Sequence, residues 1–316
     1  MTSPIRVEPT SCSVCGTAEA APEAKGKDYL HETSDQDYTF CKCAGCGHIY
    51  LNPRPVIEEI GRIYPAQYAT FTNRFGRADS LLARIKDRVL LSRFRTVEGL
   101  VPNPMRLLDV GCGDGGFLHA IRRKYPQAQL TGLDWHFGPN IAGALKSAGI
   151  ATVTGTIETA PLTEEAYDVI IMNQIIEHVW DVRLTLNSCR AALKMGGLLA
   201  IETPNPDGWD RTFFRSGAWG SYYWPRHLNL FTKAHMTRIL EESGLEVVSS
   251  NSLLAPPCWI YSIQFSASRA GVGPWFKSLF ADNNILLLAV FAVLDRVALC
   301  LGAETSNQQM IARRVR

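Results

Sequence analysis

Residues 106–118 read Arg-Leu-Leu-Asp-Val-Gly-Cys-Gly-Asp-Gly-Gly-Phe-Leu. The apolar run Leu107–Val110 predicts a strand buried in a parallel sheet, and the pattern from Phe117 onward predicts a helix. The glycines between them allow positive φ and a close approach of the backbone to a ligand. A strand, a glycine turn and a helix in this order bind nucleotide-like ligands at the carboxyl ends of parallel strands.

The carboxylate before the glycines narrows the class of ligand. Gly111, Gly113 and Gly116 fit the dinucleotide pattern G-x-G-x-x-G. Asp109, however, lies two residues before Gly111 at the end of the predicted strand, where it would repel a pyrophosphate. S-adenosylmethionine carries a sulfonium and an α-ammonium group and no phosphate, so we expect it to be the ligand.

The segment Leu108–Gly115 resembles the first motif of class I S-adenosylmethionine-dependent methyltransferases, and the resemblance extends over about residues 100–316. It implies an α/β fold, a doubly wound (Rossmann-like) seven-stranded sheet. We expect strands at 130–134, 151–153, 167–173, 198–203, 245–250 and 309–314, the last one antiparallel. Helices are expected at 80–97, 141–147, 182–195 and 232–243.

Cofactor-binding residues are expected at the ends of these strands. Asp134 ends the second strand, where a carboxylate can accept both ribose hydroxyls, and the ring of Trp135 can stack on the adenine. In this family the turn after the third strand meets the adenine edge, and a residue at the end of the fourth strand lies near the transferred methyl group. The full expected set is Asp109, Gly111, Cys112, Gly113, Asp134, Trp135, Thr156, Ile157 and Asn173.

Cysteines near the amino terminus predict a structural zinc site. Two C-x-x-C-G knuckles supply the four thiolates of a closed tetrahedral site, namely Cys12, Cys15, Cys43 and Cys46. Cys41 and His48 are alternative ligands, but only Cys43 repeats the first knuckle. We therefore expect a zinc ribbon with short strands within residues 28–40, and a piece this small needs a metal to fold.

Composition limits the classes of protein that remain. The 316 residues are 46% apolar and carry a net charge of +2, which is not the charge of a nonspecific nucleic-acid binder. Residues 1–30 lack the apolar core of a secretory signal, and clustered cysteines suit metal binding in a reducing compartment. We expect a cytoplasmic protein with three parts: a ribbon at 1–52, a helical linker or lid at 53–103 and a methyltransferase domain at 104–316.

The linker resembles that of zinc-ribbon methyltransferases from sugar and natural-product pathways, in which an Asn-Pro-Arg-Pro segment and a tyrosine pair precede the nucleotide domain. The resemblance implies that Tyr64 and Tyr68 close over the substrate; ordinary packing is the alternative. Between residues 74 and 95, basic residues outnumber acidic ones by seven to two. This predicts either a solvated face or contact with a phosphate-bearing acceptor.

An aromatic loop at 205–231 predicts a wall of the substrate pocket. Its segment Tyr222–His227 resembles the acceptor loop of zinc-ribbon sugar C-methyltransferases, which implies His227 as the proton acceptor. Arg226 stands where those enzymes often have an acidic residue, so carbon and oxygen both remain open as the methylated atom. His178 and Tyr222 are further catalytic candidates, and Tyr223 and Arg226 are expected substrate contacts. A structural hydrogen bond is the alternative role of both histidines.

The insertion at 251–305 contains an apolar run, Ile285–Leu294, which Asp295 and Arg296 follow. The run is too short to span a bilayer. We expect a core or partner-facing helix, with contact to a membrane surface as the alternative.

Three functions compete on these residues. The first is methyl transfer to a small-molecule acceptor, such as a sugar or natural-product intermediate. The second is an RNA methyltransferase with the ribbon as its RNA grip, but residues 11–50 hold three lysines against six carboxylates, which suits phosphate poorly. The third is a non-enzymatic scaffold, against which the intact Asp109, Gly111, Gly113 and Asp134 argue.

Overall fold

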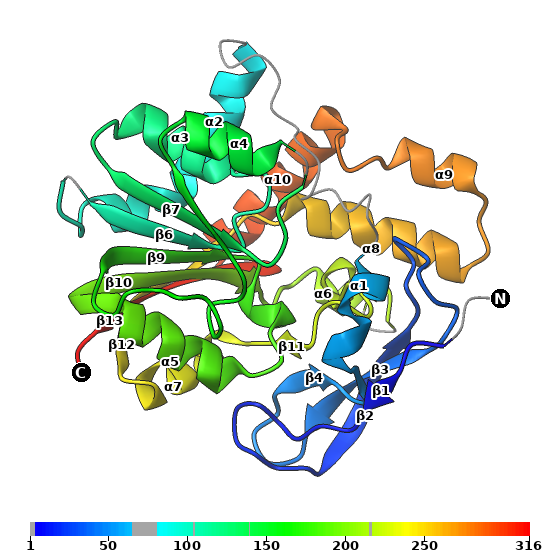
Figure 1. Ribbon diagram of the computed structural model, residues 1–316. Helices are drawn as coiled ribbons and strands as arrows, with labels where there is room; N and C mark the ends of the chain where they lie inside the picture. Colours follow the sequence, from blue (N-terminus) through cyan, green and yellow to red (C-terminus); the bar gives the residue numbers. More distant parts are fainter. Residues whose placement is uncertain (1–3, 65–80, 104, 139, 215–216) are drawn as a thin grey trace.

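The computed structural model of this chain describes residues 4–64, 81–103, 105–138, 140–214 and 217–316 (Figure 1). Tyr68 lies outside the described residues, so its expected contact with the substrate stays a prediction.

A seven-stranded sheet forms the centre of the molecule. Its order is β12 (Leu245–Leu253), β13 (Asn307–Arg314), β10 (Leu193–Pro204), β9 (Tyr167–Asn173), β6 (Arg106–Val110), β7 (Gln129–Asp134) and β8 (Ala151–Thr154). Strands β6 to β10 pair in parallel, and β13 runs antiparallel to both of its neighbours. The predicted doubly wound sheet is therefore confirmed, including its antiparallel final strand.

Helices cover both faces of this sheet (Figure 1). On one face lie α2 (Leu81–Glu98), α3 (Gly116–Lys124) and α4 (Ile141–Ser147), and on the other lie α5 (Val182–Ala192) and α7 (Lys233–Glu242). Each face has its own buried apolar core against the strands. Strands buried on both faces explain the uninterrupted apolar runs of the sequence.

One predicted helix boundary is wrong. The helix expected at 182–195 ends at Ala192, and β10 begins directly at Leu193, which pairs with Tyr167. The register then shifts between Leu193 and Leu198, around Gly196 with a φ of +77°. Gly196 and Gly197 therefore form an irregularity inside β10 and do not end a helix, because Leu193 before them already pairs with β9.

The ribbon shares its sheet with the main domain. Its strands are β2 (Ala20–Gly26), β3 (Tyr38–Cys43) and β4 (Ile49–Leu51), and β11 (Asn229–Leu230) of the main domain pairs with β4. The strands expected within 28–40 are thus wrong in position, since β2 precedes that range and β3 begins near its end. Two-residue strands β1 (Val7–Glu8) and β5 (Arg54–Pro55) and the helices η1 (Ile57–Glu59) and α1 (Ile60–Ile63) join the ribbon to the rest.

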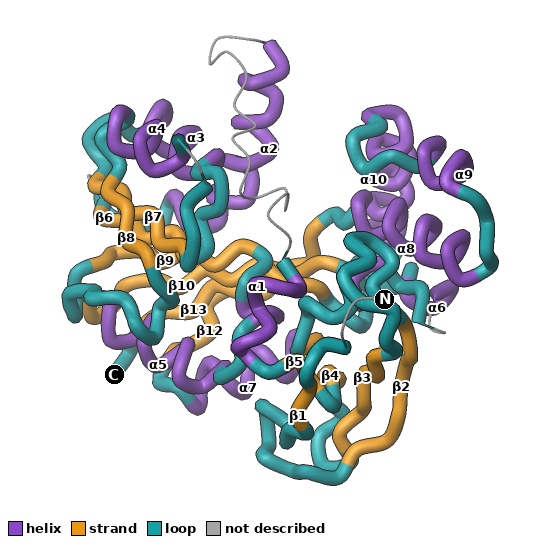
Figure 2. Tube along the Cα trace, turned by 45° about the vertical axis from the view of Figure 1, so that its right-hand side comes forward, coloured by secondary structure: helices purple, strands orange, loops and turns teal. Residues whose placement is uncertain are grey.

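The insertion folds into three helices, α8 (Pro256–Arg269), α9 (Pro274–Leu279) and α10 (Ile285–Cys300), which form one edge of the molecule (Figure 2). Asp295 does not end the apolar helix, as its sequence position suggested. It is fully buried, and it accepts hydrogen bonds from the Ala255 amide at 2.7 Å and the Trp259 indole at 2.9 Å. Within the described residues, none of the helices combines the length and apolar character needed to cross a membrane.

Candidate active site

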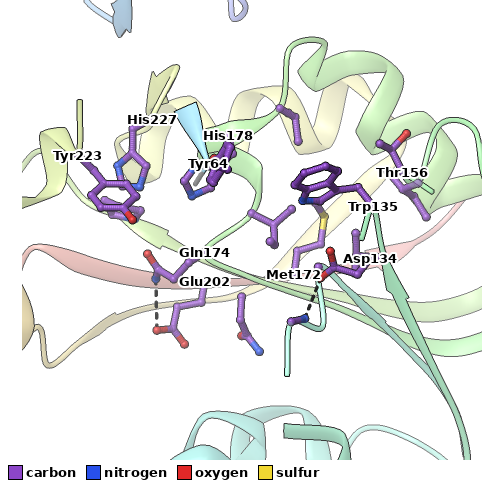
Figure 3. Close-up of a pocket in the computed structure, with 18 of the residues that line it drawn as sticks. Tyr64, Asp134, Trp135, Thr156, Met172, Gln174, His178, Glu202, Tyr223 and His227 are labelled. Carbon is purple, nitrogen blue, oxygen red and sulfur yellow. Dashed lines mark hydrogen bonds between the residues drawn. The ribbon is translucent and has the colours of Figure 1, made fainter. Parts of the chain in front are cut away.

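A cavity of about 760 Å³ opens where β6, β7, β9 and β10 end. Figure 3 shows its two ends: Asp134, Trp135 and Thr156 on one side, and His178, His227 and Tyr223 on the other. The site expected from the glycine turn and the site expected from the aromatic loop are therefore parts of one cavity.

The glycine turn forms the first end. Gly111 and Gly113 line the cavity with φ angles of +71° and +54°, which favour glycine. A Cβ on Gly111 would lie 2.1 Å from the side chain of Ile175. The Gly113 amide donates to Asp134 Oδ2 at 2.8 Å, so the turn itself holds the carboxylate at the cavity wall.

The remaining residues predicted for the adenosine side lie around the same end. Trp135, Thr156, Ile157 and Asn173 all line the cavity. Trp135 is 39% exposed, and its ring centroid lies 6.5 Å from that of Tyr64. A partly exposed indole beside a held carboxylate fits an adenosine group, with the ring as a stacking surface and Asp134 as the ribose acceptor.

Two expected cofactor residues lie away from the cavity surface. Asp109 is 3% exposed and belongs to β6, but Val110 and not Asp109 contributes to the cavity wall. Burial, with Asp134 nearby, raises the pKa of Asp109 well above its usual value. Cys112 is also buried, and its side chain packs toward Gly132. Both side chains therefore lie behind the glycine turn and not at the cavity surface.

His227 lies at the second end of the cavity. Its Nδ1 lies 2.7 Å from the carbonyl oxygen of Ser221, which can only accept, so Nδ1 carries the proton and Nε2 keeps its lone pair. Burial and the neighbouring His178 hold the pKa of His227 well below its usual value. A neutral imidazole with an unprotonated nitrogen at a cavity wall has the chemistry of a general base.

His178 lies beside it in η3 (Ile176–His178), with ring centroids 4.6 Å apart. Its Nδ1 donates to the Arg226 carbonyl at 3.0 Å, and the Tyr64 hydroxyl oxygen lies 2.9 Å from the same nitrogen. Burial lowers the pKa of His178 to about 4. The two histidines and Tyr64 thus lie close together in the cavity.

Most aromatic residues of the loop pack against the ribbon or against Trp259 of the insertion, which corrects the expected substrate wall. Tyr222 is fully buried, in a core with Trp219, Trp224 and the ribbon residue Phe40, and it does not line the cavity. Of the predicted loop aromatics, Tyr223 lines the cavity. Tyr222 therefore has the position of a structural residue and not of a catalytic one.

Arg226 is likewise buried and lies outside the cavity surface. Its guanidinium makes two hydrogen bonds of 3.0 Å to the buried carboxylate of Asp28 in the ribbon. It also lies 5.3 Å from the ring centroid of Tyr223 and 5.7 Å from that of Tyr64. Arg226 therefore packs against both tyrosine rings and links the ribbon to the loop that carries His227.

Breaking this ion pair is expected to destabilise the fold. Asp28→Asn leaves a buried guanidinium without its counter-charge, which should lower the free energy of unfolding by about 3–5 kcal/mol in urea titration. The control is Asp37→Asn, whose exposed pair with Lys25 at 3.7 Å should contribute less than about 1 kcal/mol. Equal stability of the two variants would contradict this role of Arg226.

Several cavity residues were not predicted. Glu202 Oε1 accepts from Asn307 Nδ2 at 2.7 Å and from Gln174 Nε2 at 3.4 Å, so three strand ends carry a polar cluster below the histidines (Figure 3). Gln174 also has a backbone φ of +55°, which is unusual for a residue other than glycine. Glu202 lies near the end of the strand expected at 198–203, and this position could have indicated from the sequence that it lines the cavity.

The four predicted zinc ligands come together in the ribbon. Their Sγ atoms all lie within 4.8 Å of one another, with Cys12–Cys46 at 3.6 Å and Cys15–Cys43 at 3.4 Å. Tetrahedral zinc bound by thiolates requires separations of about 3.8 Å, so the cluster fits a structural zinc ion. Cys41 is directed at the Asn52 carbonyl instead, and His48 at Ser13 and Asn229, which supports the choice of Cys43.

Comparison with known families identifies the family of the chain. A family model described as "Methyltransferase domain" matches residues 75–250, more than half of the chain. The chain therefore belongs to the methyltransferase family, and its sheet and glycine turn place it among the class I S-adenosylmethionine-dependent enzymes.

Individual relatives cover part of the chain. It is 30% identical over 167 residues to a ubiquinone biosynthesis O-methyltransferase of Nitrobacter winogradskyi, aligning 48% of this chain with 61% of that protein. It is 25% identical over 158 residues to a malonyl-(acyl-carrier protein) O-methyltransferase of Legionella pneumophila, aligning 49% of this chain with 54% of that protein. The chain thus spans less than two thirds of the length of these relatives.

A solved structure of a candidate sarcosine dimethylglycine methyltransferase from Galdieria sulphuraria has the same fold. The two chains are 19% identical with a TM-score of 0.50, over 73% of this chain and 86% of that one.

Proposed function

We propose that this protein transfers the methyl group of S-adenosylmethionine to a small-molecule acceptor. The observation that carries the proposal is a single cavity with the Gly113–Asp134 hydrogen bond at one end and the His227 Nε2 lone pair at the other. When bound, the cofactor supplies an electrophilic methyl group. Asp134 would hold the ribose, and Trp135 and Ile157 would enclose the adenine.

The protein's own part in the reaction is to position the acceptor and remove its proton. Holding two reactants in contact distance and alignment supplies much of the rate acceleration in such transfers. His227 Nε2 would take the proton of the attacking group as it loses electron density to the new bond. Tyr64 and Tyr223 would orient the acceptor beside it, with Arg226 behind both rings.

The lining of the cavity disfavours an anionic acceptor. Among the described residues that line it there is neither lysine nor arginine, whereas Ala255, Cys258 and Tyr261 of the insertion add apolar surface. A phosphate inside would therefore lack a cationic partner. A phosphate-bearing acceptor would have to direct that group out of the cavity.

The cofactor half of the proposal is tested by Asp134→Ala. Loss of a carboxylate that accepts two ribose hydroxyls should weaken S-adenosylmethionine binding about 10- to 100-fold, because hydrogen bonds to charged groups contribute about 1.5–3 kcal/mol. Calorimetry measures the change. Asp168→Ala, on the same sheet but paired with Lys194 away from the cavity, is the control and should bind normally. Wild-type protein that binds NADH and ignores S-adenosylmethionine would overturn the proposal.

Methylation of RNA is the alternative, with the ribbon as the RNA-binding part. The ribbon of this protein carries more carboxylates than lysines, which weakens binding to the phosphates of RNA. A gel shift with bulk RNA at moderate salt separates the two functions, since tight binding would favour the alternative.

A further inference from the structure

Glu177, His178 and His227 bring three possible metal ligands together at the histidine end of the cavity. One ligand atom from each lies within 4.8 Å of those of the other two. Both histidines line the cavity, and Figure 3 shows them side by side. The proposed function gives His227 a role but none to Glu177, so the buried carboxylate next to the histidines needs its own explanation.

Glu177 is fully buried and only half satisfied. Its Oε2 accepts from the Thr203 hydroxyl at 2.9 Å, while Oε1 has no hydrogen-bond partner among the described residues. Oε1 instead lies 3.9 Å from His227 Nε2. Burying a carboxylate oxygen without a partner is costly, and a cation between these two atoms would remove that cost.

Both histidine rings are held as metal-binding histidines usually are. Each donates Nδ1–H to a backbone carbonyl, His178 to that of Arg226 and His227 to that of Ser221. Such a bond fixes the ring and the tautomer, and it leaves the Nε2 lone pair for a metal. The nearby positive charge of Arg226 is balanced by its ion pair with Asp28.

We propose that Glu177, His178 and His227 bind a divalent first-row transition-metal ion, separately from the four-cysteine site, and that this ion inhibits methyl transfer. Imidazole with carboxylate suits Zn²⁺, Fe²⁺ or Co²⁺. Tetrahedral zinc needs ligand atoms about 3.4 Å apart, so the 3.9 Å pair has to close by about 0.5 Å. Three protein ligands leave the fourth position facing the cavity, through which the ion enters.

The inhibition follows because the metal ion and the proton of the methyl acceptor would both bind the lone pair of His227 Nε2. A metal bound to His227 Nε2 occupies the electron pair that would accept the acceptor's proton, so the ion and the proton compete. This part of the inference rests on the proposed function, whereas the binding of the metal does not.

Cobalt titration of the zinc-loaded protein tests the binding without any methyl transfer. We expect one further equivalent of Co²⁺ with the visible d–d bands of a four-coordinate site of nitrogen and oxygen ligands and without a thiolate charge-transfer band. Glu177→Gln and His178→Gln should each weaken this binding at least ~10-fold while the zinc content stays constant. Glu165→Gln, whose exposed carboxylate pairs with Arg314, is the matched control and should bind as the wild type does.

If the zinc-loaded wild-type protein binds no further equivalent of Co²⁺, the proposed site is wrong, whether or not the variants fold. The inhibition is tested with Zn²⁺ added beyond the first equivalent, which should lower turnover at least ~10-fold and be reversed by a weak chelator that leaves the ribbon zinc in place. Unchanged turnover with the second site filled would overturn the inhibition. Metal uptake by a protein that never methylates would support the site and contradict only the proposed function.

Discussion

Replacing His227 with alanine is expected to lower turnover at least ~10²-fold, because general-base catalysis contributes about that much. Binding of S-adenosylmethionine should be unchanged, since His227 lies at the opposite end of the cavity from Asp134 (Figure 3). Single-turnover kinetics with saturating cofactor, together with calorimetry, measures the two effects separately.

The matched control for this variant is His119→Ala. His119 lies on α3, outside the cavity, and its loss should leave both turnover and cofactor affinity near those of the wild type. His178→Ala tells the two histidines apart: a larger loss than with His227→Ala would make His178 the proton acceptor. Near-normal turnover of His227→Ala would remove His227 from that role.

Loss of the ribbon zinc is expected to have the largest effect on stability. Structural zinc sites contribute apparent binding free energies of about 10–16 kcal/mol in small peptides, and much of this is folding free energy. Cys43→Ser should therefore release the metal and lower the melting temperature sharply. Turnover should fall as well, because β11 pairs with ribbon strand β4 directly after the loop that carries His227.

Cys41→Ser is the control within the same strand. Cys41 is outside the cluster of four thiols and should leave the zinc content unchanged. Zinc analysis and thermal unfolding measure both variants. Retention of zinc by Cys43→Ser and its loss from Cys41→Ser would show that the ligand assignment is wrong.

Local patterns in the chain were sufficient for much of the fold. The strand Tyr167–Asn173 was predicted to the residue, as was the helix Ile141–Ser147, because each has a clear apolar pattern with polar or glycine residues at its ends. The helix expected at 232–243 is α7, and Thr232 caps it by accepting a hydrogen bond from the His235 amide. Such features depend on neighbours in the sequence, which a pattern can register.

Side-chain direction was less predictable at the end of a strand. Asp109 and Val110 are adjacent, and successive side chains of a strand point to opposite faces. The sequence placed Asp109 toward the ligand, but Val110 lines the cavity and Asp109 is buried beside Asp134. Which of two neighbours faces the cavity depends on how the sheet twists and on which helices cover it.

By itself, then, the sequence determined the doubly wound sheet, the glycine turn after its first strand and the four-cysteine ribbon, because each comes from short-range periodicity or spacing. Only the tertiary structure decided that Tyr222 and Arg226 join the ribbon to the main domain rather than contact a substrate. It alone also brought Glu177 to His227. These contacts link residues far apart in the chain, and their formation depends on how whole elements pack, which local composition does not encode.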